Sequence, residues 1–322
     1  MAKTKTAVVV GATNGIGKAI SHRLASAGFQ VVAVGRDREG RAEEIVNDLT
    51  KASNASGSGE AVKHEFRPCD AFHLAQVKKC AEEIVRDYVG VSGDGGKGGI
   101  DALVMTQGMA TVQSFTPTSE GNDEKLTLHF WSRAAFTNCL LPALRTSCET
   151  NEMKGGPVVL TVLSGSVHSP YSKYKDDPEL RNNYSVKNAA DFAGYYTDLF
   201  FDKMAKQPSN QGINFVHACP GFVATNWGTE MPMFLRGPIR LMQKIGGKSP
   251  DKCAGFMVNP ILACVSGEMK MTRPNGAMEG LFIMKEDATG GKLTKDHSPE
   301  AMESAWNTTK SVLKKAGIDL AE

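Results

Sequence analysis

Three glycines near the start of the chain have the spacing of a phosphate-binding turn. Gly11, Gly15 and Gly17 follow the apolar run 6–10, and apolar side chains then repeat every fourth residue, as on one face of a helix. Glycines between a strand and a helix let the backbone approach a pyrophosphate, and the helix amino terminus offers free N–H groups and the positive end of its dipole. A magnesium-dependent P-loop is excluded, because an alanine instead of a hydroxyl residue follows Lys18. The spacing therefore predicts a dinucleotide site.

The elements that must position this turn alternate along the chain. Apolar runs predict strands at 6–10, 30–34, 61–66, 100–105, 158–163 and 213–218. Helices are expected between them, the longest at 121–146 and 184–206, and a last helix is expected at 298–317. Near-continuous apolar strands separated by amphipathic helices indicate an α/β fold, a doubly wound parallel sheet that is covered on both faces.

Further motifs occur in an order that resembles the short-chain dehydrogenase/reductase family. The glycine turn is similar to the family's fingerprint, and three later groups match in order: Thr106–Gln107–Gly108, Leu140–Leu141–Pro142 and Pro220–Gly221-x-Val223-x-Thr225. The resemblance covers about residues 6–285. It implies a Rossmann fold, with one dinucleotide-binding and catalytic domain at 1–285 and a C-terminal helical tail at 286–322. The polar insertion 171–183 and the tail are similar to those of the longer, retinol-dehydrogenase-like members.

The resemblance also implies a nicotinamide cofactor and its contacts. The assigned residues are Gly11, Thr13, Asn14, Gly15, Ile16 and Gly17 in the turn, Asp70 at the adenine, Gly108 and Lys187 at the ribose, and Pro220, Gly221, Val223 and Thr225 towards the nicotinamide. The residue after the second strand decides the type of cofactor. Arg36 offers a guanidinium for a 2′-phosphate, and Gly35–Arg36 has no carboxylate for a ribose 2′-hydroxyl, so NADP(H) is predicted. A solvated loop residue at position 36 is the alternative.

Four residues are predicted to act on the substrate oxygen and its proton. Family members use a Tyr-x-x-x-Lys pair, in which the ammonium lowers the pKa of the phenol so that it can pass a proton near neutral pH. The resemblance assigns Tyr184 and Lys187 to this pair, and Ser164, with Ser166 as the fallback, to the hydrogen bond with the substrate oxygen. His129 stands where the family has an asparagine, and an imidazole there could relay a proton.

The Tyr–Lys match departs from the family pattern. Tyr184 and Lys187 lie three residues apart instead of four, and counting back from Pro220 puts Ala190 and Gly194 at the two positions. Three functions stay open. The first is an NADP(H)-dependent oxidoreductase with a shifted catalytic pair. The second is an NADP(H)-binding sensor or interaction protein that transfers no hydride. The third is a reductase in which an atypical acid such as His129 replaces the tyrosine.

Composition argues against several other classes of protein. Of the 322 residues, 41% are hydrophobic and 22% are charged, which is typical of a globular chain. The 37 basic and 35 acidic residues nearly balance, which argues against a nucleic-acid-binding protein. No apolar run approaches the roughly 20 residues of a transmembrane segment, and no signal peptide precedes the first strand. Seven cysteines without a Cys-x-x-Cys pair indicate reduced thiols, no metal site and a cytoplasmic protein.

The segment that follows the sixth strand is predicted to cover the substrate. Residues 222–248 carry large apolar side chains among methionines, prolines and glycines. These side chains are Trp227, Met231, Met233, Phe234, Leu235, Leu241, Met242 and Ile245. An adaptable apolar lid suits a hydrophobic carbonyl or alcohol as a small-molecule substrate. A lid that packs on its own domain and a contact within a homo-oligomer are the alternatives, and Arg236 and Arg240 could admit an anionic group.

Overall fold

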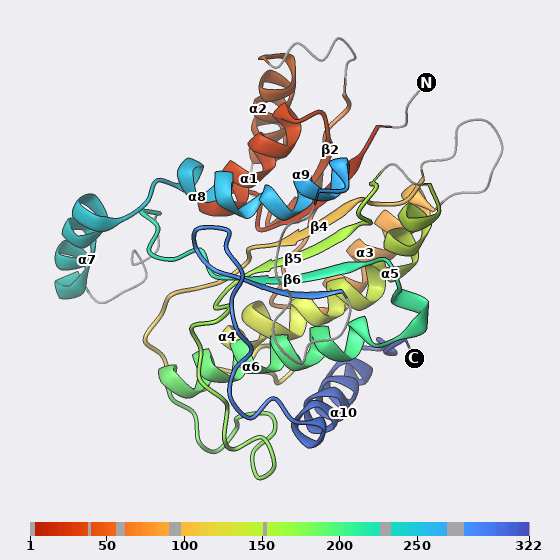
Figure 1. Ribbon diagram of the computed structural model, residues 1–322. Helices are drawn as coiled ribbons and strands as arrows, with labels where there is room; N and C mark the ends of the chain where they lie inside the picture. Colours follow the sequence, from red (N-terminus) through yellow and green to blue (C-terminus); the bar gives the residue numbers. More distant parts are fainter. Residues whose placement is uncertain are drawn as a thin grey trace.

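The fold was taken from a computed structural model of the 322-residue chain (Figure 1). It describes residues 4–37, 40–55, 62–89, 98–150, 153–225, 233–268 and 280–321. Among the helices of these ranges, none combines the length and the apolar character that crossing a bilayer requires.

A seven-stranded sheet in the order β3-β2-β1-β4-β5-β6-β7 forms the centre of the molecule, and all neighbouring strands are parallel. The strands are β1 (Thr6–Val10), β2 (Gln30–Gly35), β3 (Glu65–Pro68), β4 (Ala102–Met105), β5 (Val158–Val162), β6 (Asn214–Ala218) and β7 (Leu281–Met284). The predicted doubly wound parallel sheet is confirmed. The sequence analysis missed β7, because a four-residue apolar run is too short to distinguish from a helix segment.

Helices cover both faces of the sheet. Figure 1 shows α1 (Gly15–Ser26), α2 (Arg41–Ala55), α8 (Pro250–Met257) and α9 (Asn259–Ser266) on one side. The other side carries α3 (Leu74–Tyr88), α5 (Ser132–Thr150), α6 (Val186–Ala205) and α10 (Pro299–Lys315). In β1, Ala7 and Val9 pack in the first core, and Val8 and Val10 pack in the second. Side chains that alternate between two cores explain why the strands are apolar throughout.

The predicted helix 121–146 is three segments instead of one. The structure has α4 (Glu124–Leu126), a π-helix η1 (Thr127–Trp131) and then α5. Asp123 caps α4 by accepting the N–H of Leu126 at 3.0 Å. Arg133 Nε donates to the carbonyl oxygen of Leu128 at 3.2 Å, so a side chain takes up a backbone acceptor of the widened turn. Single π turns of this kind are frequent at functional sites.

The C-terminal helix forms as predicted, with Ser298 as its N-cap and Pro299 at its first position. It packs against α6, where the rings of Trp306 and Phe200 stack with centroids 5.7 Å apart. Buried side chains of α10 belong to the same core as α3, α5 and α6. The tail therefore shares a core with the sheet that carries the site.

Candidate cofactor and catalytic site

The glycine turn has the backbone that a pyrophosphate site needs. Gly11 and Gly15 have φ values of 84° and 56°, in the left-handed region that favours glycine. A Cβ atom on Gly17 would lie 2.2 Å from the carbonyl oxygen of Gly11 and 2.4 Å from Thr106 Oγ1, so only glycine fits. Asn14 caps α1, because its Oδ1 accepts the N–H of Gly15 at 2.8 Å. The turn and the helix amino terminus fit a dinucleotide phosphate.

The sheet brings two other predicted cofactor segments to this turn. Strand order reverses between β1 and β4, which is where open α/β sheets bind ligands. Directly after β4, the N–H of Thr106 donates to the carbonyl oxygen of Val10 at 2.9 Å, so 106–108 lies beside the turn. Thr225 lies beyond β6, and its Cγ2 is 3.4 Å from the place that a Cβ on Gly15 would take. Segments far apart in the sequence thus meet around the glycine turn.

Arg36 lies at the end of β2, beside the turn. A Cβ on Gly35 would lie 2.5 Å from Thr13 Cγ2, so the turn packs directly over the end of this strand. The guanidinium of Arg36 lies over the ring of Phe72 at 5.9 Å. Within the described ranges, no carboxylate forms an ion pair with Arg36. Asp70, assigned to the adenine, accepts the N–H of Phe72 at 3.1 Å and holds this neighbouring loop. The guanidinium thus lies next to the glycine turn without an ion-pair partner among the described residues.

Ser164 lies where β5 ends, as predicted. Its hydroxyl oxygen is buried and has no hydrogen-bond partner in the described part of the chain. Its N–H donates to His217 Nε2 at 3.1 Å. The fallback, Ser166, has a φ of 70°, and its hydroxyl accepts the N–H of Lys292 at 3.3 Å. Of the two serines, Ser164 is the one whose hydroxyl has no hydrogen-bond partner among the described residues.

Tyr184 and Lys187 do not form a pair in the structure. Ser185 is the N-cap of α6, so Tyr184 precedes the helix and the argument that both side chains share one helix face fails. The Tyr184 hydroxyl donates to Asp123 Oδ1 at 3.2 Å. Burial, together with the charge of Asp123, raises the pKa of this phenol instead of lowering it. The Lys187 ammonium lies 2.5 Å from Asp191 Oδ2 on the surface.

His129 lies in the π-helix and is a neutral hydrogen-bond acceptor. Its Nε2 accepts the N–H of Met109 at 3.1 Å. Burial lowers the pKa of His129 to about 3, and the charges of Arg133 and Lys125 contribute in the same direction. A Cβ on Gly108 would lie 2.9 Å from this nitrogen, so the imidazole supports the 107–109 segment. The predicted proton relay lacks support from this geometry, because the Nε2 atom holds no proton to give.

Sequence reasoning missed the buried Arg133. Its Nη1 donates to Thr161 Oγ1 at 2.5 Å and to the carbonyl oxygen of Val162 at 3.0 Å. Its Nη2 donates to the carbonyl oxygen of Gln107 at 2.5 Å. Burial lowers the pKa of Arg133 to about 9. The guanidinium thereby ties the ends of β4 and β5 to α5. An arginine in the mostly apolar segment 128–136 was the available signal.

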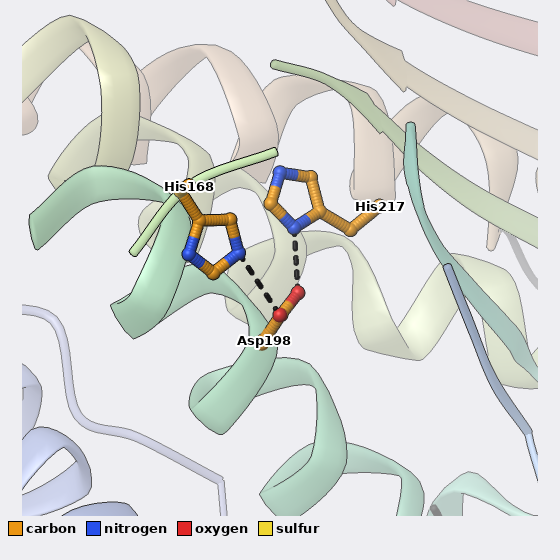
Figure 2. A group of neighbouring side chains, drawn as sticks. All are labelled: His168, Asp198 and His217. Atoms are coloured by element: carbon orange, nitrogen blue, oxygen red, sulfur yellow. Dashed lines mark hydrogen bonds and ion pairs between the residues drawn. The ribbon is translucent and has the colours of Figure 1, made fainter. Parts of the chain in front are cut away.

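A second missed group is a buried carboxylate between two imidazoles (Figure 2). His217 Nδ1 and His168 Nε2 lie 2.6 Å and 3.0 Å from the two oxygens of Asp198. Burial opposes a charge on Asp198, but the hydrogen bonds and charges of His217 and His168 hold its pKa well below the usual range. Asp198 lies between the aromatic pairs Tyr195–Tyr196 and Phe200–Phe201 of α6, and His217 interrupts the apolar β6. These are the signals that could have found them.

The two positions obtained by counting back from Pro220 contain no acid or base. Ala190 is exposed near the start of α6. Gly194 is covered: a Cβ there would lie 2.4 Å from the ring of His168 and 2.5 Å from Ser164 Oγ. The loop that carries Ser164 and His168 therefore packs directly on the helix at Gly194, and it fills the space that a larger side chain would need.

The predicted lid is only partly within the described residues. Trp227 and Met231 lie outside them, as do the side chains of Met233, Phe234 and Leu235. Helix α7 (Met233–Gly246) lies at the periphery of the molecule in Figure 1. Its described apolar side chains Leu241, Met242 and Ile245 are 59%, 60% and 80% exposed. An apolar helix face thus lies on the surface beyond β6.

The fold and the glycine turn together define a dinucleotide-binding α/β protein. The chain belongs to the short chain dehydrogenase family, because the model of that family, described as "short chain dehydrogenase", matches residues 5–172.

Curated relatives are distant. The chain is 24% identical over 221 residues to the "NmrA-like family domain-containing oxidoreductase notO" of Aspergillus sp., and the match covers 68% of this chain and 60% of that protein. It is 24% identical over 268 residues to retinol dehydrogenase 14 of Mus musculus, covering 81% of this chain and 73% of that protein. Among solved structures, an NADPH-bound carbonyl reductase from chicken fatty liver superposes with a TM-score of 0.57 at 14% identity, covering 90% of this chain and 99% of that chain. This structural likeness shows the fold alone.

Proposed function

We propose that the chain is an NADP(H)-dependent oxidoreductase that interconverts a hydrophobic carbonyl compound and its alcohol. The observation that carries the proposal is the glycine turn beside Arg36: the turn has no room for any Cβ at Gly17, and the guanidinium lies over the ring of Phe72 next to the turn, which suits a 2′-phosphate. The name of one similar protein, retinol dehydrogenase 14, supports this chemistry.

Each group of residues at the proposed site has a separate role. When bound, the nicotinamide supplies or accepts the hydride. The glycine turn binds the pyrophosphate, and Arg36 selects the phosphorylated ribose. The Ser164 hydroxyl donates a hydrogen bond to the substrate oxygen, on which negative charge develops when a carbonyl is reduced, and water supplies the proton that completes the alcohol. The apolar face of α7 offers a hydrophobic cover for the rest of the substrate.

A second candidate is an NADP(H)-binding sensor or interaction protein that transfers no hydride. The observation that favours it is the separation of Tyr184 and Lys187, whose polar atoms contact Asp123 and Asp191 instead of each other. Such a protein would bind the cofactor and leave every carbonyl compound unchanged.

The test is NADPH consumption with matched apolar and charged carbonyl compounds. We expect turnover of the apolar compounds to exceed that of the charged ones by about tenfold or more.

Ser164→Ala is expected to lower kcat by about 100-fold, because it removes the donor to the oxyanion. Tyr184→Phe is expected to keep kcat within about threefold, because that hydroxyl contacts Asp123.

The outcomes separate the candidates. No turnover by protein that binds NADPH would support the second candidate. A loss of about 100-fold in Tyr184→Phe, with an unchanged unfolding midpoint, would show that Tyr184 is the proton donor after all. Equal turnover of apolar and charged compounds would contradict the proposed substrate class.

A further inference from the structure

The pairing of β5 with β6 ends at the main chain of Ser164. The last pairing of β5 with β6 is Val162 with Ala218, and Leu163 still donates its N–H to Ala218. The next N–H, that of Ser164, donates to the side chain of His217 at 3.1 Å. The carbonyl oxygen of His217 lies 2.2 Å from where a Cβ on Gly165 would be, so the turn passes tightly over this residue. His217 thus holds Ser164 from the neighbouring strand.

The two contacts of His217 fix its tautomer. A backbone N–H can only donate, so Nε2 must be the unprotonated acceptor. The proton therefore lies on Nδ1, which donates to Asp198 Oδ1 at 2.6 Å. Burial lowers the pKa of His217 despite the nearby carboxylate. If His217 were an imidazolium, its Nε2–H would face the N–H of Ser164, and the hydrogen bond between the two residues would be lost.

Asp198 is held in turn by His168 and its surroundings. The Nε2–H of His168 donates to Asp198 Oδ2 at 3.0 Å, and Thr294 Oγ1 is 3.4 Å from the same oxygen. Burial alone would lower the pKa of His168, but the hydrogen bond and the charge of Asp198 outweigh it and raise that pKa. The other charges that act on the two imidazoles are Asp191 of α6 and Arg133 of α5. The hydrogen bond and the charge of Asp198 therefore favour the protonated form of His168.

The same three side chains could also be considered as metal ligands, since their nearest donor atoms all lie within 4.8 Å of one another. Coordination through His217 Nδ1 would move its proton to Nε2, because a metal-bound histidine carries its proton on the other nitrogen. That proton would then face the N–H of Ser164. The hydrogen-bond directions therefore favour a proton-bearing network over a metal site.

The network of His217, Asp198 and His168 contacts Ser164, whose hydroxyl the proposed reaction requires. Ser164 Oγ is buried without a hydrogen-bond partner among the described residues. It and the ring of His168 both lie within 2.6 Å of the point where a Cβ on Gly194 would be. We propose that His217 is a positioning residue, which orients Ser164 towards the substrate oxygen while Asp198 and His168 fix its tautomer. This inference rests on the proposed function.

Two substitutions of His217 separate positioning from packing. A glutamine carboxamide extends to the place of Nε2 and can accept the N–H of Ser164, whereas an asparagine carboxamide is shorter and reaches only the place of Nδ1. We expect His217→Asn to lower kcat by about 50-fold and His217→Gln by less than about fivefold, with KM for NADPH unchanged in both. Equal losses of kcat in the two variants, at equal unfolding midpoints, would overturn the proposal.

A second measurement needs neither a substrate that is turned over nor a variant, because it uses the unmodified protein. Nitrogen NMR of the unliganded protein labelled at its histidines should show His217 with a proton on Nδ1 and none on Nε2, and no protonation of His217 where an ordinary histidine titrates. A proton on Nε2, or titration near the ordinary pKa, would overturn the proposal. The proposal would also be overturned if added zinc chloride removed the Nδ1 proton of His217 and raised the unfolding midpoint of the protein. If no carbonyl compound is turned over, the proposed function fails by itself, and this spectrum alone decides whether His217 holds Ser164.

Discussion

The Gly17→Ala variant is expected to bind NADPH at least about 30-fold more weakly than the unmodified chain, a loss of roughly 2 kcal/mol. The added Cβ would lie 2.2 Å from the carbonyl oxygen of Gly11 and 2.4 Å from Thr106 Oγ1. The turn must open to relieve these contacts, which moves the helix amino terminus away from the pyrophosphate. The dissociation constant, measured by cofactor fluorescence, checks this expectation.

Gly255→Ala is the matched control, because it adds the same methyl group within helix α8. There a Cβ would lie 3.5 Å from the nearest atom, in the Arg23 guanidinium, which is an ordinary van der Waals contact. We expect this variant to bind NADPH as the unmodified chain does and to be slightly more stable, because alanine favours a helix over glycine. Unchanged NADPH affinity in Gly17→Ala would show that the cofactor does not use this turn.

Arg133→Met is expected to cost about 3 kcal/mol or more of unfolding free energy. Methionine keeps much of the volume but donates no hydrogen bond. The carbonyl oxygens of Gln107, Leu128 and Val162 then lose their contacts with the guanidinium in a buried place. Arg133 is only 3% exposed, so little water reaches this group to replace the lost contacts. Urea unfolding followed by circular dichroism measures the loss.

The control for this prediction is Arg145→Met, on the same helix α5. Arg145 is partly exposed, and it donates to Asn210 Oδ1 at 2.8 Å and to Ser209 Oγ at 2.9 Å. Water can replace these contacts, so we expect a loss of about 1 kcal/mol. If the two variants lose the same free energy, Arg133 does not tie the ends of β4 and β5 together.

Local patterns in the sequence were enough to predict six of the seven strands and the glycine turn. The glycine spacing specifies a backbone that larger residues cannot adopt, and the apolar runs specify strands that are buried on both faces. The cap at Ser298 likewise marks the start of α10 correctly. These features depend on residues that are close together in the sequence, so a single sequence is enough to reveal them.

The catalytic part could not be predicted in the same way. Ser185 caps α6, which puts Tyr184 outside the helix, whereas the sequence analysis expected the helix to begin at residue 184. His168, Asp198 and His217 come from a loop, a helix and a strand and meet only in the folded chain. The count back from Pro220 pointed to Gly194, but only the structure shows that His168 fills the space there. Long-range contacts of this kind leave no periodic pattern.

The central claim is that the chain binds NADP(H) through the glycine turn and Arg36. The most direct test compares the thermal unfolding midpoint with NADPH and with NADH at equal concentrations, because a ligand that binds only the folded state stabilises it by RT ln(1 + [L]/Kd). A clear rise with NADPH and a smaller one with NADH is the predicted result. A rise with NADH alone would contradict the role of Arg36, and no rise with either would contradict the claim that this turn binds a dinucleotide.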